Sequence, residues 1–212
     1  MSNLYTKGNF EPINDAFIRD SYSALQKISD VQAQYNKNDM DTLLNELHDS
    51  IVGSYLGFRL VNTEKHGFDC KLDKDRGIYL ESKVASLHSR SWSATFNDTT
   101  EEKAESFKDD KVFLALSIWD NAAKVCCIAY GQHPDIGEYL LEGVRHHQQG
   151  LTVRSTQTIS FKKLIFEYKF KILSIYMEPD DLIYHLQMYQ RSLRGLTRDK
   201  IIRCNEFRSI FD

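Results

Sequence analysis

The chain has 212 residues, of which 42% are hydrophobic and 27% charged, and its formal net charge is -3. Three prolines and ten glycines exclude a collagen-like or low-complexity chain, and the length suits one domain with its own core. No apolar run approaches the ~20 residues that a membrane span needs. The N-terminus lacks the basic start and apolar stretch of a signal peptide. We therefore expect a single-domain cytoplasmic protein, residues 1–212, without membrane association.

The first half of the chain predicts helices and strands in alternation. A weak helical period covers residues 15–34, and a clearer one runs from Met40 to Phe58 with Asp39 or Asp41 as its cap. Strands are expected over 58–61, 66–72 and 77–87, with a turn at 74–77. A charged helix over 99–108, capped by Thr99 or Asp98, follows these strands.

The second half begins with two apolar runs. Residues 112–119 are continuously apolar, as in a strand that is buried on both faces, and 124–130 is its expected hairpin partner. Helices are predicted over 134–144, 160–170 and 180–193, with a short strand over 152–158 and an unassigned tail from Arg194. This order predicts an α/β fold in which helices flank a mixed sheet.

Several familiar motifs are missing from the sequence. There is neither a GxxxxGK[ST] loop nor a GxGxxG turn, so no nucleotide cofactor is expected. Gly77-Ile78-Tyr79 matches half of a GIY-YIG motif, but no Tyr-Ile-Gly follows it at hairpin spacing. The four cysteines form no CxxC pair, which favours buried reduced thiols over a zinc site.

Two acids and a lysine form the pattern with the clearest chemical meaning. Asp69 precedes a predicted turn, and Glu81 and Lys83 share one face of the next predicted strand because side chains alternate along a strand. Carboxylate oxygens suit Mg²⁺, which also engages substrate phosphate. A nearby lysine can orient the attacking water and balance the growing negative charge. These are the tasks of phosphodiester hydrolysis.

Two other interpretations of these residues remain open. Glu81 and Lys83 can instead form a solvent-facing salt bridge of no catalytic importance, since a chain that is 27% charged contains such patterns by chance. Asp73 and Asp75 can also take the place of Asp69, although both fall in the expected turn.

From about Met40 to Tyr130 the sequence resembles the PD-(D/E)xK nuclease superfamily, and most of all a type II restriction endonuclease. The resemblance rests on 67–69 (Gly-Phe-Asp), on 79–83 (Tyr-Leu-Glu-Ser-Lys) and on the element order around them. Phe68 stands where the family name has Pro. The resemblance implies a restriction-endonuclease-like αβββαβ core over about 40–130, with probable DNA-recognition and dimerisation additions, largely helical, over 131–212.

The resemblance also implies which residues carry the chemistry. Asp69 and Glu81 would bind Mg²⁺, and Lys83 would support the attacking water. Some members add a Glu from the preceding helix, for which Glu46 is the candidate. The implied substrate is double-stranded DNA, cut at a short sequence by a homodimer.

DNA contacts are expected in two segments. Residues 145–212 carry 12 Lys and Arg against 7 Asp and Glu, whereas 1–144 carry 15 against 23, so the second part of the chain favours a polyanion. Arginine and glutamine suit base edges, and histidine and lysine suit phosphates. The candidates are Ser89, Arg90, Trp92, Arg145, His146, His147, Gln148, Gln149 and Arg154.

Two alternative functions are compatible with the same residues. A repair or junction-resolving nuclease would use the same three residues, Asp69, Glu81 and Lys83, on branched or damaged DNA. A non-catalytic nucleic-acid-binding or interaction domain would carry these acids only as surface charge.

Overall fold

The structure, a computed structural model, describes residues 15–36, 39–61, 67–72, 77–152 and 156–207. The chain divides into two compact units, Met1–Asn45 and Glu46–Asp212. The first unit contains α1 (Asp15–Gln34) and the beginning of α2 (Met40–Leu56). Asp39 caps α2, because its Oδ2 accepts a hydrogen bond of 2.8 Å from the Thr42 backbone N–H. Both helices lie where the sequence predicts them.

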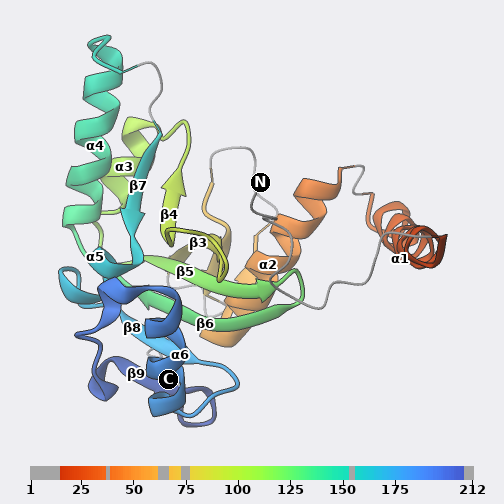
Figure 1. Cartoon of the computed structure of the whole chain (residues 1–212). Coiled ribbons are helices and arrows are strands. Elements are labelled where there is room, and N and C mark those ends of the chain that lie inside the picture. Colours follow the sequence, from red (N-terminus) through yellow and green to blue (C-terminus); the bar gives the residue numbers. More distant parts are fainter. Residues whose placement is uncertain (1–14, 37–38, 62–66, 73–76, 153–155, 208–212) are drawn as a thin grey trace, which may run out of the picture. The chain divides into compact units, whose positions relative to one another are not determined.

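A mixed sheet forms the centre of the second unit (Figure 1). Among the described residues its strands have the order β1-β2-β3-β5-β6-β8-β9, with β3–β5 and β8–β9 parallel and the other pairs antiparallel. The strands are β1 (Phe58–Leu60), β2 (Cys70–Leu72), β3 (Tyr79–Ser86), β5 (Val112–Asn121), β6 (Lys124–Gly131), β8 (Lys171–Ser174) and β9 (Ile201–Arg203).

Helices and a small second sheet complete this unit. The antiparallel pair β4–β7 lies beside the main sheet (Figure 1). The remaining elements are β4 (Ser93–Phe96), α3 (Glu101–Ser106), α4 (Asp135–Gln148), β7 (Gln157–Ser160), α5 (Phe161–Phe166), α6 (Pro179–Tyr189) and the 3₁₀ turns Arg191–Leu193, Arg198–Lys200 and Cys204–Glu206.

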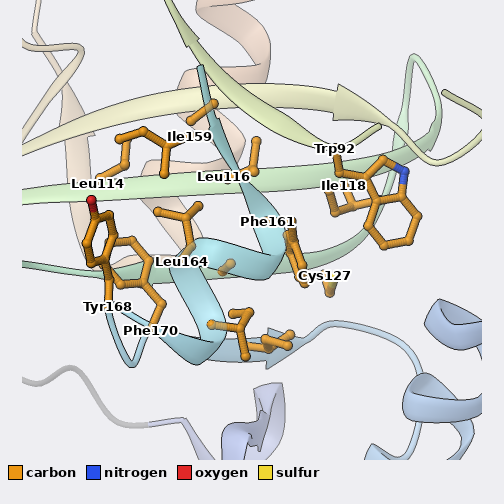
Figure 2. Close-up of a cluster of buried hydrophobic side chains, with 14 of the residues drawn as sticks. Trp92, Leu114, Leu116, Ile118, Cys127, Ile159, Phe161, Leu164, Tyr168 and Phe170 are labelled. Carbon is orange, nitrogen blue, oxygen red and sulfur yellow. The ribbon is translucent and has the colours of Figure 1, made fainter. Parts of the chain in front are cut away.

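Each face of the main sheet has its own apolar core. On one face, Leu114 and Leu116 of β5 pack with side chains of α3, α4, α5 and α6, and Figure 2 shows Phe161 and Leu164 of α5 directed into this cluster. On the other face, Ala115 packs with Val52 and Leu56 of α2. The alternation along β5 therefore buries both faces, which explains why its sequence from Val112 to Trp119 is apolar except for Ser117.

The expected α/β class and mixed sheet are confirmed, but several boundaries differ from the sequence-based prediction. α4 continues four residues beyond Val144, so the polar run after that residue is helical and not a connection to a strand. Thr100, and not Thr99 or Asp98, caps α3. β4, β8 and β9 were not predicted, and α5 ends at Phe166, shortly before Lys169 adopts a φ of 61°.

No helix in the described part of the chain is long and apolar enough to cross a membrane. All four cysteines carry free thiols, and three of them are buried. The prediction of buried reduced thiols therefore holds for Cys70, Cys126 and Cys127, whereas Cys204 is half-buried.

Candidate active site

Beyond Leu80, one edge of β3 has no neighbouring strand among the described residues, and a carboxylate binds the β3 backbone there instead. β2 pairs with β3 only at Cys70↔Leu80 and Lys71↔Tyr79, and no described strand borders this edge beyond Leu80. Asp69 directly precedes β2, and its Oδ2 accepts a hydrogen bond of 2.7 Å from the Ser82 backbone N–H. This bond satisfies a backbone donor that would otherwise face the open edge.

Glu81 and Lys83 lie on one face of β3, as the two-residue strand period predicts. Their register partners on β5 are Leu114 and Leu116, which belong to the apolar core of that face. The Lys83 Nζ donates a hydrogen bond of 2.6 Å to Glu81 Oε1. The Glu81 side chain is only 2% exposed, so the alternative of a solvent-facing salt bridge is wrong. The structure thus brings Asp69, Glu81 and Lys83 to one place.

A second lysine, which the sequence analysis did not single out, also reaches Glu81. Lys103 comes from α3, and its Nζ donates a hydrogen bond of 2.9 Å to Glu81 Oε1. The same Nζ lies 2.8 Å from Oε2 in an ionic contact outside hydrogen-bond geometry, and 3.3 Å from the Gly67 carbonyl oxygen, to which it donates. One buried carboxylate is therefore held by two ammonium groups.

An aromatic ring lies close to the ammonium group of each of the two lysines. Lys83 Nζ lies 5.4 Å from the centre of the Phe96 ring, and Lys103 Nζ lies 5.6 Å from that of Phe68. These distances are within the range of a cation–π interaction. The rings restrict access of water to the ammonium groups, which strengthens the electrostatic interactions in the site.

A third acid approaches from the opposite face of the sheet. Asp49 lies on α2, and burial raises its pKa to about 6, although the nearby Ser82 hydroxyl and the Lys83 ammonium act in the opposite direction. Glu81 and Glu46 raise the pKa of Asp49 further. The helix therefore supplies Asp49 to the site, whereas Glu46, one turn earlier, acts on Asp49 through its charge.

The charges in this site depend strongly on one another. Burial raises the pKa of Asp69 to about 7, and the charges of Glu81 and Asp49 act in the same direction. Burial alone would lower the pKa of Lys83, but Glu81, Asp69 and Asp49 more than offset this, and the pKa of Lys83 is raised. The Lys83 side chain therefore stays an ammonium ion near neutral pH.

Ser89, Arg90 and Trp92, which follow β3 and were predicted to contact DNA, lie partly in the core and partly at the surface. Trp92 is 2% exposed, packs against Phe161 (Figure 2), and donates through its Nε1 to the Leu87 carbonyl oxygen at 3.2 Å. The prediction that Trp92 contacts DNA is therefore wrong, because its side chain is committed to the core. Arg90 is exposed, and the Ser89 hydroxyl donates to the carbonyl oxygens of neighbouring residues.

The other residues predicted to contact DNA lie at the C-terminal end of α4. All of those that the structure describes are exposed. They line two different grooves. Arg145, His146 and Gln149 border a groove of about 700 Å³ between α4 and α5, whereas His147 and Gln148 border another groove against the beginning of α3. Arg154 lies outside the described residues, as do Asp73 and Asp75.

The groove between α4 and α5 does not have the charge of a polyanion site. Lys163 crosses it, with its Nζ 5.0 Å from the Tyr139 ring centre and 5.2 Å from that of Tyr168. Its four carboxylates outnumber its lysine and arginine, so the lining repels phosphate unless the histidines are charged. These charged groups are Asp135, Glu138, Glu142, Glu167, Arg145 and Lys163.

Carboxylates that converge beside an ammonium group can hold a hard divalent cation and stabilise a phosphoryl group. As they stand, no three Asp, Glu, His or Cys side chains of the described residues are arranged to hold a metal ion together. No protein-family model matches the chain, and no curated protein is significantly similar to it. The function must therefore be inferred from the chemistry of the site.

Proposed function

We propose that this chain is a Mg²⁺-dependent endonuclease of the PD-(D/E)xK superfamily that cuts double-stranded DNA at a specific sequence, as a type II restriction enzyme does. The observation that carries the proposal is the meeting of Asp69, Glu81 and Lys83 at the open edge of β3. Independent surface charges would be exposed and separate. Here Lys83 donates directly to Glu81, Asp69 binds the backbone N–H of Ser82, which lies between them, and the three side chains are largely buried.

The order and pairing of the elements support the same proposal. α2, β1, β2, β3, α3 and β5 follow one another as in an αβββαβ core, with β4 inserted before α3. The acids lie on the second and third of these strands or directly before them, and β3 pairs in parallel with β5. This arrangement is the one that the resemblance of the sequence implies for a restriction-endonuclease-like fold.

The donor groups of the site fit Mg²⁺. Asp69 and Glu81 would hold the ion through carboxylate oxygens, which this ion prefers, and Asp49 would act on the site through its charge. Burial, followed by the charges of Glu81 and Asp49, raises the pKa of Asp69, and a bound divalent cation would stabilise the charged form of this carboxylate. The buried Oε2 of Glu81 accepts no hydrogen bond and lies in ionic contact with Lys103, so it can become a ligand when a cation replaces that ammonium group. Bound Mg²⁺ supplies a Lewis acid that polarises a phosphoryl oxygen and lowers the pKa of a water molecule.

The protein's own groups then position the reactants. The Lys83 ammonium, which is held beside Glu81, donates a hydrogen bond to the attacking water and balances the charge that develops on the phosphoryl oxygens. The water oxygen forms a bond to phosphorus and gives up a proton to solvent, while the P–O bond to one deoxyribose oxygen breaks and that oxygen takes up a proton from solvent. Because the pKa of Lys83 is raised, the lysine acts as a donor and not as the base that removes the proton of the water.

The DNA would lie across the open edge of β3, with the remaining polar surface positioning it. Arg90 follows β3 and is exposed, as are the residues that end α4, from Arg145 to Gln149. A homodimer would place two such sites on a palindromic sequence, because the two-fold axis of the protein then matches that of the DNA.

Digestion of plasmid DNA tests this function. With Mg²⁺ we expect discrete fragments, and with EDTA none. Asp69→Asn keeps an oxygen that accepts the Ser82 N–H but loses the charge, so it should not cut, whereas Glu105→Gln, which replaces an exposed acid paired with Lys108, should cut like the wild type. Intact plasmid at every Mg²⁺ concentration, or wild-type cleavage by Asp69→Asn, contradicts the proposal. Cleavage of branched DNA alone would instead favour a junction-resolving nuclease.

A further inference from the structure

Lys103 contacts Glu81, although it does not belong to the predicted set of Asp69, Glu81 and Lys83. It belongs to α3, which is separated from β3 in the sequence by β4, and its Nζ reaches both oxygens of the Glu81 carboxylate, at 2.9 Å and 2.8 Å. Its side chain is 19% exposed, whereas that of Glu81 is 2% exposed. Lys103 therefore covers part of the Glu81 carboxylate and is itself only partly exposed.

We propose that Lys103 is an internal counter-ion, which occupies the cation position beside Glu81 in the metal-free protein and leaves Glu81 when a divalent cation binds. This inference rests on the proposed function, because it concerns the same carboxylates. It assigns to Lys103 a positioning role that the PD-(D/E)xK pattern of the sequence does not contain.

The balance of charge in the site gives the reason. In their ionised forms, Asp49, Asp69 and Glu81 carry three negative charges, and Lys83 and Lys103 carry two positive ones. A buried carboxylate is stable only with such compensation. If a divalent cation bound to Glu81 while both lysines stayed, three cations would surround one carboxylate in a poorly solvated site, where repulsion is strong.

The contacts indicate that Lys103, and not Lys83, is the lysine that moves. Lys83 is two residues from Glu81 on the same strand, and its Nζ donates a short hydrogen bond of 2.6 Å to Oε1. The contact of Lys103 with Oε2 is outside hydrogen-bond geometry. Lys103 also keeps other partners when it leaves the carboxylate, namely the Gly67 carbonyl oxygen and the Phe68 ring.

Displacement of Lys103 has two consequences. The affinity for the cation becomes the result of a competition with the ammonium group for the same oxygens. The released ammonium group remains at the edge of the site, where the phosphate of a bound DNA strand can accept its hydrogen bonds. Lys103 thereby couples occupation of the site by metal to the presence of DNA.

Calorimetric titration of the whole chain with Mn²⁺ or Mg²⁺, without DNA, tests the inference. Lys103→Met removes the charge and keeps the length of the side chain, and it should bind the cation about tenfold more tightly than the wild type, or better. Lys103→Gln keeps a hydrogen-bond donor without the charge and should behave like Lys103→Met. Lys103→Arg keeps the charge and should bind like the wild type, as should Lys108→Met, whose lysine pairs with Glu105 and Glu138.

Thermal unfolding provides a second measurement of the same competition. Without metal, Lys103→Met should melt below the wild type, because Glu81 has lost one of its two cations. Saturating Mg²⁺ should raise the melting temperature of this variant by more than it raises that of the wild type. A ligand that binds only the folded state stabilises it in proportion to its affinity.

The possible failures are distinguishable. If Glu81→Gln prevents cation binding but Lys103→Met and Lys103→Gln bind no more tightly than the wild type, the counter-ion role is wrong and the nuclease proposal stands. If neither the wild type nor any Lys103 variant binds a divalent cation, both proposals fail. Tighter binding by Lys103→Arg as well would show that the fit of the side chain, and not its charge, controls the site, and would also overturn the inference.

Discussion

The edge of β3 and the end of α4 both carry clusters of charged and polar side chains, but the two regions are built differently. At β3, Asp69, Glu81 and Lys83 are largely buried, and each has a defined partner within the site. At the end of α4, the side chains from Arg145 to Gln149 are exposed and border two separate grooves. The first region is one interacting unit, and the second is a set of independent side chains.

This difference follows from the energetics of burial. A buried charge without a partner is costly, so the fold must bring compensating groups to it from several elements. An exposed charge is stabilised by water and contributes little through any single ion pair. Variants at the two regions should therefore differ in the size of their effects and in whether those effects depend on one another.

Glu81→Ala should have the largest effect. Loss of this carboxylate removes a metal ligand and leaves Lys83 and Lys103 without their shared partner, so the cleavage rate should fall at least about 10³-fold. DNA binding in Ca²⁺ should persist, because removal of a negative charge does not weaken the attraction for phosphate. A cleavage assay paired with a binding assay measures both. Wild-type cleavage by this variant would require the nuclease proposal to be abandoned.

Replacements of the two acids of α2, Asp49 and Glu46, should lower the cleavage rate to clearly different extents. Asp49 interacts with Glu81 and Lys83, whereas Glu46 acts on Asp49. We therefore expect Asp49→Asn to lower the cleavage rate by up to about a hundredfold, the size of effect seen for groups that support metal ligands, and Glu46→Gln to change it by less than about threefold. Rates measured over a range of Mg²⁺ concentrations provide the comparison. The opposite order would restore Glu46 as the acid that the helix contributes.

The stability of the metal-free protein should increase as the pH is lowered from about 7 to about 5. The pKa values of Asp69 and Asp49, about 7 and about 6 in the folded state, lie above their values in the unfolded chain, so the folded state binds more protons in this range. The gain should be about 3 to 4 kcal/mol. Urea denaturation in EDTA measures it, and Asp69→Asn should show a smaller gain. A loss of stability over this range would contradict the assigned environment of the two acids.

Replacements at the end of α4 should have the smallest effects. Arg145→Ala and Gln148→Ala should each weaken DNA binding by about 1 kcal/mol, the low end for a base contact, because neither side chain is held by a surrounding network. Their effects should add in the double variant, since they border different grooves. Binding measured at several salt concentrations is the test. A strongly non-additive double variant would show that the two grooves form one interface.

The sequence was sufficient to find Glu81 and Lys83 because strand alternation places both on one face, and β3 follows that alternation. Asp69 was identified by its distance from the turn, and its bond to Ser82 is consistent with that reasoning. The hairpin of β5 and β6 was also predictable, because two largely apolar runs flank a short polar segment at 120–124.

Asp49 and Lys103 were missed because their positions depend on packing between elements. Their helical spacing nevertheless contained a signal. Asp49 precedes the buried Val52 of α2 by three residues, and Lys103 precedes the buried Phe107 by four, so each shares a helix face with a core residue. The short strands β4, β8 and β9 were missed because three or four residues are too few for a period to be recognised.

The bond between Asp69 and the Ser82 N–H also bears on the solubility of the protein. An open strand edge is a template on which a second chain can add a strand, and such additions lead to aggregation. At β3 the carboxyl group of Asp69 already binds the backbone N–H that an incoming strand would need. Asp69 therefore acts as a gatekeeper against edge-to-edge association. Replacement by a small apolar residue would uncover this edge in addition to removing an acid from the site.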